Sequence, residues 1–177
     1  MTRAMAAVGV IFALCACGDD DSLDEAAAKD AVNEAVNIAS LTYTNVSAGL
    51  GKLDGEWVTG DAAGFTVQGS LNGTQGGTGA VSGEGKKEGT TYTFDLAIKL
   101  DGWKGRSGLV LDGTLRARYE VTNLAGGLMT ISFGGDVSVG GSASGSAGFD
   151  AEVIYSEPGK YAICGDVSGV DVSTEGC

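Results

Sequence analysis

The feature that most constrains this chain is a two-residue period of apolar side chains, which begins after residue 55. Between residues 91 and 100 every second position is apolar, and most positions between them are polar. Successive side chains of a β-strand point to opposite faces, so this period predicts strands with one buried and one solvated face, as in antiparallel sheets. The inward positions of this segment are Tyr92, Phe94, Leu96, Ile98 and Leu100.

The same period recurs in the segments 65–71, 109–121 and 147–155. Near Gly134 and Gly135 the alternation is interrupted, which predicts a bulge or a sharp bend. The inward positions of the three segments are Phe65, Val67 and Leu71; Leu109, Leu111, Leu115, Ala117, Tyr119 and Val121; and Ala147, Phe149, Ala151, Val153 and Tyr155.

Turn signals separate these segments, for example at residues 72–77, 101–108 and 139–142. No connection after residue 60 has room for a helical crossover, which favours hairpins between neighbouring strands. Residues 42–177 are therefore expected to form one mainly β domain. Its predicted fold is a curved antiparallel up-and-down meander of about seven or eight strands, either an open sheet or barrel-like. The 31 glycines suit tight turns and strong curvature.

Residues 22–41 carry the one clear helical pattern. Ser22 and Glu25 predict a capping box, and Glu25 with Lys29 predicts a favourable ion pair one turn apart. Because the apolar arc of the helix is shallow and mostly alanine, we expect it to pack closely on the sheet. The arc consists of Ala27, Ala28, Ala31, Val32, Ala35, Val36, Ile38 and Ala39.

The N-terminus indicates export. One cation, Arg3, precedes an apolar run over residues 4–16, which is short for a bilayer span and typical of a signal peptide. The run ends in the sequence Leu14-Cys15-Ala16-Cys17, and aspartates follow at once. This pattern resembles the bacterial lipobox, which has Leu at position −3, a small residue at −1 and then the cysteine. Only Cys17 fits, because the residue before Cys15 is the large Leu14.

The lipobox resemblance implies that residues 1–16 are a signal peptide, cleaved between Ala16 and Cys17, and that the thiol of Cys17 is lipidated. Residues 17–21 would then be an acidic linker that reaches less than about 20 Å. The predicted location is the bacterial cell envelope, at the periplasmic face of the inner or outer membrane or at the cell surface. An ordinary secretory signal cleaved nearby is the alternative interpretation.

Export also bears on the remaining cysteines. Once Cys15 leaves with the signal peptide and Cys17 is acylated, Cys164 and Cys177 are left in a compartment where disulfides persist. An even pair predicts a disulfide that closes the C-terminal tail. Two free thiols are the alternative.

Several classes of chemistry are excluded or unsupported. The chain has no histidine, which excludes a Ser-His-Asp triad, a Cys-His dyad and any zinc site with a histidine ligand. The net charge of −12 argues against a nucleic acid partner, because phosphate binding needs clustered Lys and Arg. The sequence predicts no catalytic residue, metal or cofactor.

Two features of the predicted sheet could contact a ligand. Arg116 and Arg118 share a solvated strand face near Lys99 and could hold a carboxylate or phosphate. The commoner outcome is pairing with acids of the same face, here Asp95, Asp112 or Glu120. Trp103 lies in a turn segment, where we expect the indole to fold over its own sheet rather than to act as an exposed contact.

The favoured hypothesis is a membrane-anchored, non-catalytic envelope lipoprotein with a structural or protein-interaction role. The alternative is a carrier of a lipid or other hydrophobic ligand, since a curved sheet with a helix over its concave face resembles in outline the bacterial LolA-like lipoprotein-carrier fold. The inward small residues Gly113, Ala117 and Ala147 could leave the cavity that a carrier needs. An enzyme with paired carboxylates is a third hypothesis, for which no site signature is present. The expected partners are the membrane and an envelope protein or hydrophobic ligand.

Overall fold

A computed structural model describes residues 23–124, 128–157 and 160–177. The predicted signal peptide (1–16), the linker (17–21) with Ala16 and Cys17, and Ser22 of the expected capping box lie outside the described residues. The elements are α1 (Glu25–Leu50), β1 (Val58–Gly60), β2 (Phe65–Asn72), β3 (Gly76–Glu88), β4 (Thr91–Lys104), β5 (Leu109–Thr122), β6 (Met129–Gly141), β7 (Gly145–Glu157), β8 (Lys160–Val167) and β9 (Val170–Asp171).

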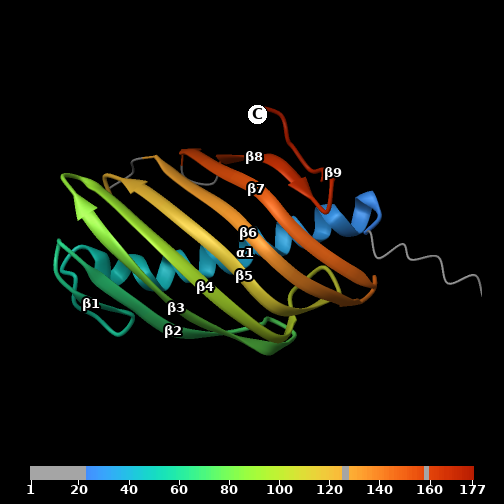
Figure 1. The fold of residues 1–177 in the computed structure, drawn as a ribbon, viewed down its shortest axis with the longest axis horizontal. Coiled ribbons are helices and arrows are strands. Elements are labelled where there is room, and N and C mark those ends of the chain that lie inside the picture. Colours follow the sequence, from blue (N-terminus) through green and yellow to red (C-terminus); the bar gives the residue numbers. More distant parts are fainter. Residues whose placement is uncertain (1–22, 125–127, 158–159) are drawn as a thin grey trace, which may run out of the picture.

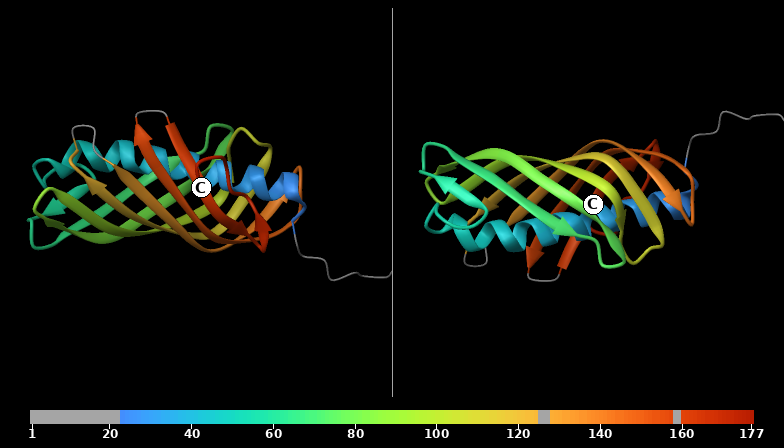
Figure 2. Two further views of the ribbon diagram at one scale, coloured as in Figure 1. Left: turned by 90° about the horizontal axis from the view of Figure 1, so that it is seen from above. Right: turned by 90° about the horizontal axis from the view of Figure 1, so that it is seen from below.

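The strands form one open nine-stranded sheet in sequence order, and each neighbouring pair is antiparallel. Figure 1 shows α1 lying across one face of this sheet. In Figure 2 the sheet curls toward the helix, and α1 contacts strands at both edges, including β1 and β9. The predicted mainly β meander with one packed helix is confirmed. The strand number exceeds seven or eight because β1 and β9 are very short edge strands.

The inner face of the sheet, which faces α1, carries the residues that the two-residue period selects. All of the predicted inward positions in β2, β4, β5 and β7 are buried, apart from Tyr155, which is partly buried. The alanine-rich arc of α1 is buried against them. Small side chains on the helix let the backbone approach the sheet closely, so that one core fills the space between the two layers.

The helix differs from its predicted limits at both ends. It continues nine residues beyond 41, because Thr42, Val46 and Leu50 extend its buried face. The Thr42 hydroxyl donates a hydrogen bond to the carbonyl of Ile38 at 2.8 Å, which satisfies a polar group inside the helix. At the start, the N-cap is Asp24, whose carboxylate accepts a hydrogen bond from the Ala27 amide at 2.7 Å.

Of the two outcomes predicted at Gly134 and Gly135, a bulge or a sharp bend, the bulge is wrong. The register of β5 against β6 is the same on both sides of these glycines, with Arg116 opposite Gly134 and Gly113 opposite Val137. Gly135 instead adopts a positive φ of 95°, and a Cβ at this position would lie 2.7 Å from the Thr114 carbonyl. A glycine in an unbroken strand therefore accounts for the interruption of the pattern.

The edge of the sheet at β8 is covered by the C-terminal tail. The Thr174 amide donates to the Ile163 carbonyl at 2.8 Å, and the Ile163 amide donates to the Thr174 hydroxyl at 2.9 Å. The disulfide between Cys164 and Cys177 joins the end of the tail to β8, as the cysteine count predicted. Covering this edge removes unpaired backbone groups that could template aggregation.

Candidate functional site: a charged groove on the outer face

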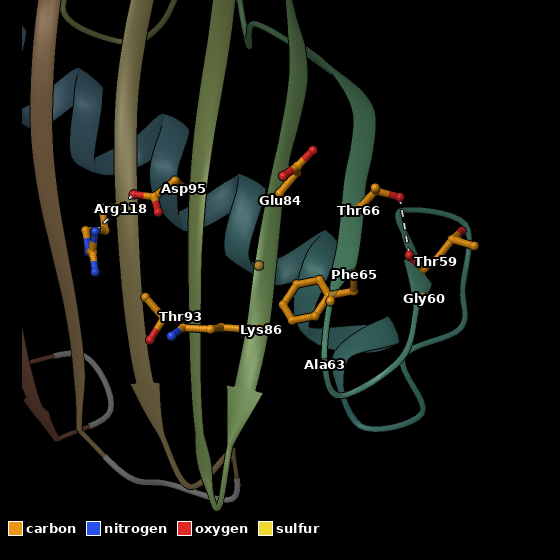
Figure 3. A pocket seen from close by; sticks show the side chains of 12 residues that line it. Thr59, Gly60, Ala63, Phe65, Thr66, Glu84, Lys86, Thr93, Asp95 and Arg118 are labelled. Carbon is orange, nitrogen blue, oxygen red and sulfur yellow. Dashed lines mark hydrogen bonds and ion pairs between the residues drawn. The ribbon is translucent and has the colours of Figure 1, made fainter.

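The outer face of the sheet, opposite α1, holds two adjoining hollows that we call the outer groove. One, of about 710 Å³, extends from the β1–β2 turn to β5, and the other, of about 780 Å³, extends from β3 to β6. They share the charged residues Glu84, Asp95 and Arg118. Figure 3 shows these side chains rising from three adjacent strands, β3, β4 and β5.

Strand register explains why these charges meet. Glu84 is paired with Asp95, and Asp95 with Arg118, so one cross-strand row carries two carboxylates and a guanidinium. Their positions alternate with the buried positions of the same strands and therefore face solvent. Directly opposed like charges are unfavourable in a sheet, and Arg118 offsets the repulsion between the two acids.

The predicted ion pair between Arg118 and Asp95 is present but loose. Nη1 of Arg118 lies 3.7 Å from Oδ1 of Asp95, and the two side chains are 60% and 66% exposed. Exposed pairs of this kind contribute at most about 1 kcal/mol to stability. Asp112, a second expected partner, instead accepts a hydrogen bond from the Gly102 amide at 2.6 Å. The Arg118 guanidinium therefore remains able to contact another molecule.

Arg116 extends the groove along β5. Within the part of the chain that the structure describes, it makes no ion pair or hydrogen bond. Its neighbours across the sheet are the small residues Ala97 and Gly134, which line the same hollow and leave space beside the guanidinium. Arg116 also lines a further hollow of about 470 Å³ with Thr114, Gly135 and Asp136.

Lys86 supplies a further cation at the β3 end of the groove. Its Nζ lies 2.6 Å from a carboxylate oxygen of Glu88, and this hydrogen bond lowers the pKa of the Glu88 carboxyl. At the β1 end, the Thr66 hydroxyl donates to the Thr59 carbonyl at 3.2 Å (Figure 3). The groove thus offers charges of both signs together with hydroxyl groups, a chemistry suited to a polar partner.

A separate polar cluster lies on the inner side and was missed by the sequence analysis. Glu34 of α1 is only 4% exposed, and its carboxylate accepts hydrogen bonds from Trp103 Nε1 at 3.0 Å and the Arg106 amide at 3.3 Å. Asn37 Nδ2 donates a third, at 3.1 Å. A Cβ at Gly105 would overlap the carboxylate, so a larger residue there would displace Glu34 from these donors.

The Glu34 cluster has a structural role. Its carboxylate joins the helix to the end of β4 and to the turn that follows it. The expected burial of the Trp103 indole is confirmed, but the residue lies in β4 and not in a turn. All of the partners of the carboxylate are N–H donors, which satisfy a buried anion. One signal in the sequence pointed to this cluster, since Glu34 is a single acid between apolar positions of the helical arc, three residues after Ala31 and four before Ile38.

The inner face is filled at two of the three positions on which the carrier hypothesis depends. A cavity large enough for water would leave its lining accessible, but Ala117 is 1% and Ala147 0% exposed. The third of these residues, Gly113, is exposed rather than buried, because without a side chain it leaves the strand open to solvent. Ala117 and Ala147 therefore leave no cavity at their positions, and the carrier hypothesis stays a prediction.

The chain matches no protein family model, no curated protein and no solved structure. Among the described residues, no group of three or more Cys, Asp or Glu side chains is placed to hold a metal ion. No helix in the described ranges is long and apolar enough to cross a membrane.

Proposed function

We propose that this protein is a membrane-anchored lipoprotein of the bacterial envelope, whose β domain has a non-catalytic interaction role. Lipid on Cys17 provides the anchor, and the outer face of the sheet provides the contacts. The observation that carries the interaction role is the contrast between the two faces of one sheet. The inner face is sealed by α1, whereas the outer face is hollowed and carries charged side chains with loose or absent partners.

The length of the tether supports a location close to the membrane. α1 begins at Glu25, eight positions after Cys17, and Leu23 is already buried in the core. The residues between Cys17 and Leu23 can therefore extend only about 20 Å. Acylation with two or three chains gives stable anchoring, since each buried methylene contributes about 0.8 kcal/mol.

The chemistry of the outer groove supports binding rather than catalysis. Glu84 and Asp95 are the paired carboxylates nearest to a hollow, and both are exposed on an open sheet surface. Glycosidase-type catalysis places one carboxyl in an apolar pocket that keeps it protonated. This pair, with Arg118 beside it, instead lies on an open surface where it can contact a partner's cations.

Anchoring is tested by comparing Cys17→Ala with Cys15→Ala in a bacterial host. We expect Cys17→Ala to abolish incorporation of labelled fatty acid and to leave a larger, uncleaved precursor. Cys15→Ala is the matched control and should be processed, acylated and recovered with membranes. Labelled fatty acid on the Cys17→Ala protein, or its normal processing, would overturn the lipoprotein assignment.

The interaction role is tested with a photo-crosslinking amino acid at Ser132 in the outer groove, compared with Asn33 on the exposed side of α1. We expect a discrete crosslinked species in intact cells from position 132 and none from position 33. Crosslinking that is equal at the two positions, or absent from the groove, would contradict the assignment of the outer face as the contact surface.

A further inference from the structure

The outer face carries arginines and acids at matching positions on either side of β6. Two cross-strand rows pass over β5, β6 and β7, and each has an arginine on β5, a small residue on β6 and an acid on β7. The first row is Arg116, Gly134 and Asp150, and the second is Arg118, Ser132 and Glu152.

The two charged pairs have matching geometry. Residues two positions apart on one strand face the same side and are separated by about 7 Å, which holds for the arginine pair and for the acidic pair. Neighbouring strands are about 4.8 Å apart, so the pairs lie at equal distances on either side of β6, about 10 Å from each other. Asp150, Arg116 and Arg118 are exposed and Glu152 is partly exposed.

We propose that the outer face binds a second copy of this chain, with a two-fold axis that runs along β6 between the facing sheets. Rotation about this axis exchanges the two sides of β6 and keeps the position along the strand. It therefore places Arg116 against Asp150 of the second copy and Arg118 against Glu152 of the second copy. Because the interface is isologous, each contact occurs twice, which gives four ion pairs.

Small residues along β6 allow the two sheets to approach. Nothing lies within 4 Å of the position that a Cβ on Gly134 would occupy, and the next outward residue is Ser132. Packed sheets lie about 10 Å apart, a distance that side chains of opposite charge from β5 and β7 span together. Among the described residues, the partly exposed Glu152 has only a long hydrogen bond from the Ser132 hydroxyl, at 3.5 Å.

Charge complementarity favours a second copy over another occupant. The net charge of −12 opposes association of two identical chains, so any such contact must be supported by local pairs of opposite charge. Arg116 has no partner within its own chain among the described residues, and the ion pair of Arg118 is loose. Asp150 and Glu152 match the two arginines in spacing and lie in the same cross-strand rows of this chain, so a second copy supplies the partners that the arginines lack.

This inference names the partner for the interaction role proposed above and rests on it. A contact strip of three strands gives weak association in solution. Two copies anchored in one membrane leaflet are held at a high effective concentration, which strengthens a weak contact without any new interaction.

One residue on the axis opposes the dimer and provides a distinctive test. Asp136 is the next outward residue of β6 after Gly134 and would face Asp136 of the second copy. Like charges at this distance repel. Asp136→Asn is therefore expected to strengthen association, whereas loss of a charge elsewhere on the face would weaken it or leave it unchanged.

The experiment uses the full chain in a bacterial host and introduces a thiol on the axis. A residue on a two-fold axis meets its own copy, here across a gap of about 10 Å, which is too wide for a direct disulfide. A short bismaleimide should therefore link Ser132→Cys to its own copy, whereas Ser82→Cys, two strands from β5, should not be linked. Charge reversals are then added to Ser132→Cys. Arg116→Asp and Asp150→Arg should each lower the crosslinked fraction roughly five- to ten-fold, because each replaces two attractive pairs by two repulsive ones.

The double reversal is the decisive variant. Arg116→Asp combined with Asp150→Arg restores complementary pairs, and the crosslinked fraction should return to within about two-fold of the Ser132→Cys protein. Equal crosslinking from positions 132 and 82, a crosslink at position 132 to a different protein, or no recovery in the double variant would overturn the dimer. Normal acylation of Cys17 in the same cells would show that the anchoring proposal survives even then.

Discussion

The two faces of the sheet are built from alternate residues of the same strands, yet they differ in almost every physical property. Phe94 is completely buried and stacks on Tyr119 with ring centroids 4.6 Å apart, whereas the next residue, Asp95, is exposed beside an open hollow. The inner face packs on α1 over its whole length. The outer face carries many small polar groups, and no described helix or strand covers it. The contrast suggests that the inner face determines the fold and that the outer face is free to determine the contacts.

The largest expected difference in the free energy of unfolding is between substitutions of two adjacent residues, Phe94 on the inner face and Asp95 on the outer face. Phe94→Ala should lower the free energy of unfolding by about 3–5 kcal/mol, because it removes a buried aromatic side chain and leaves a cavity. Asp95→Ala should change it by less than about 0.5 kcal/mol. Urea denaturation of both variants measures the difference, and similar losses would contradict the division of roles between the faces.

The disulfide is the one feature near the outer face that is expected to stabilise the fold strongly. Replacing both cysteines, Cys164→Ser with Cys177→Ser, should lower the free energy of unfolding by about 3 kcal/mol. The disulfide spans a sequence separation of 13 residues, and closing a loop of that order restricts the unfolded chain by about this amount. Hydrogen exchange at the Ile163 amide should accelerate as the tail leaves β8. Exchange that remained slow without the disulfide would show that the tail is held by its hydrogen bonds alone.

The buried carboxylate of α1 is expected to have the next largest effect. Glu34→Gln keeps the shape but turns an amide donor toward an existing N–H donor, either Trp103 Nε1 or the Arg106 amide, and should cost about 2 kcal/mol. Glu25→Gln, whose side chain is 71% exposed on the same helix, is the control and should cost less than about 0.5 kcal/mol. Thermal unfolding of both proteins at neutral pH distinguishes them, and equal midpoints would refute the role of Glu34.

Alkaline pH should lower the free energy of unfolding through a buried group of the inner face, the Tyr119 phenol. Burial raises the pKa of the Tyr119 phenol above its ordinary value of 10, so the folded state holds this proton more tightly than the unfolded state does. Its contribution to stability is complete below about pH 10 and is lost as the pH rises further. Tyr119→Phe removes the 3.0 Å hydrogen bond that the phenol donates to the Ala39 carbonyl. This loss should lower the free energy of unfolding by about 1 kcal/mol at neutral pH.

Above pH 10, however, Tyr119→Phe should lose stability less steeply than the unmodified protein. Tyr161→Phe is the control, because Tyr161 is 44% exposed, and it should keep the original slope. Denaturant titrations at intervals from pH 8 to 11 provide the comparison. Parallel curves for all three proteins would exclude ionisation of Tyr119 as a cause of alkaline unfolding.

The inner face could be predicted from the sequence far better than the outer one. Alternation alone identifies buried residues such as Phe94 and Ala117, because burial depends on which face a residue occupies. The limits of α1 were less predictable, since Thr42 and Asn45 resemble helix breakers until their side chains bond within the helix. Glu34 was missed because two of its partners, Trp103 and the Arg106 amide, lie about seventy residues away, at the end of β4 and in the turn after it.

The outer groove depends on register, which the two-residue period does not specify. That Arg118 lies beside Asp95 was one of three possibilities, and the alignment of Arg116 with Asp150 across Gly134 follows only from two successive strand pairings. A shift by two residues would preserve every buried position and rearrange all of these charges. The charged rows could therefore be recognised only once the pairing of β5, β6 and β7 was known.

The measurement that tests the division between the two faces most directly is thiol reactivity in intact envelopes. Single substitutions Ala97→Cys in the outer groove and Asn33→Cys on the exposed side of α1 are labelled in cells and in the purified, diluted protein. The native pair, Cys164 and Cys177, is already a disulfide. We predict that labelling at position 97 is slowed several-fold in envelopes, whereas position 33 reacts equally in both settings. Equal rates at position 97 would contradict the claim that the outer face is the contact surface.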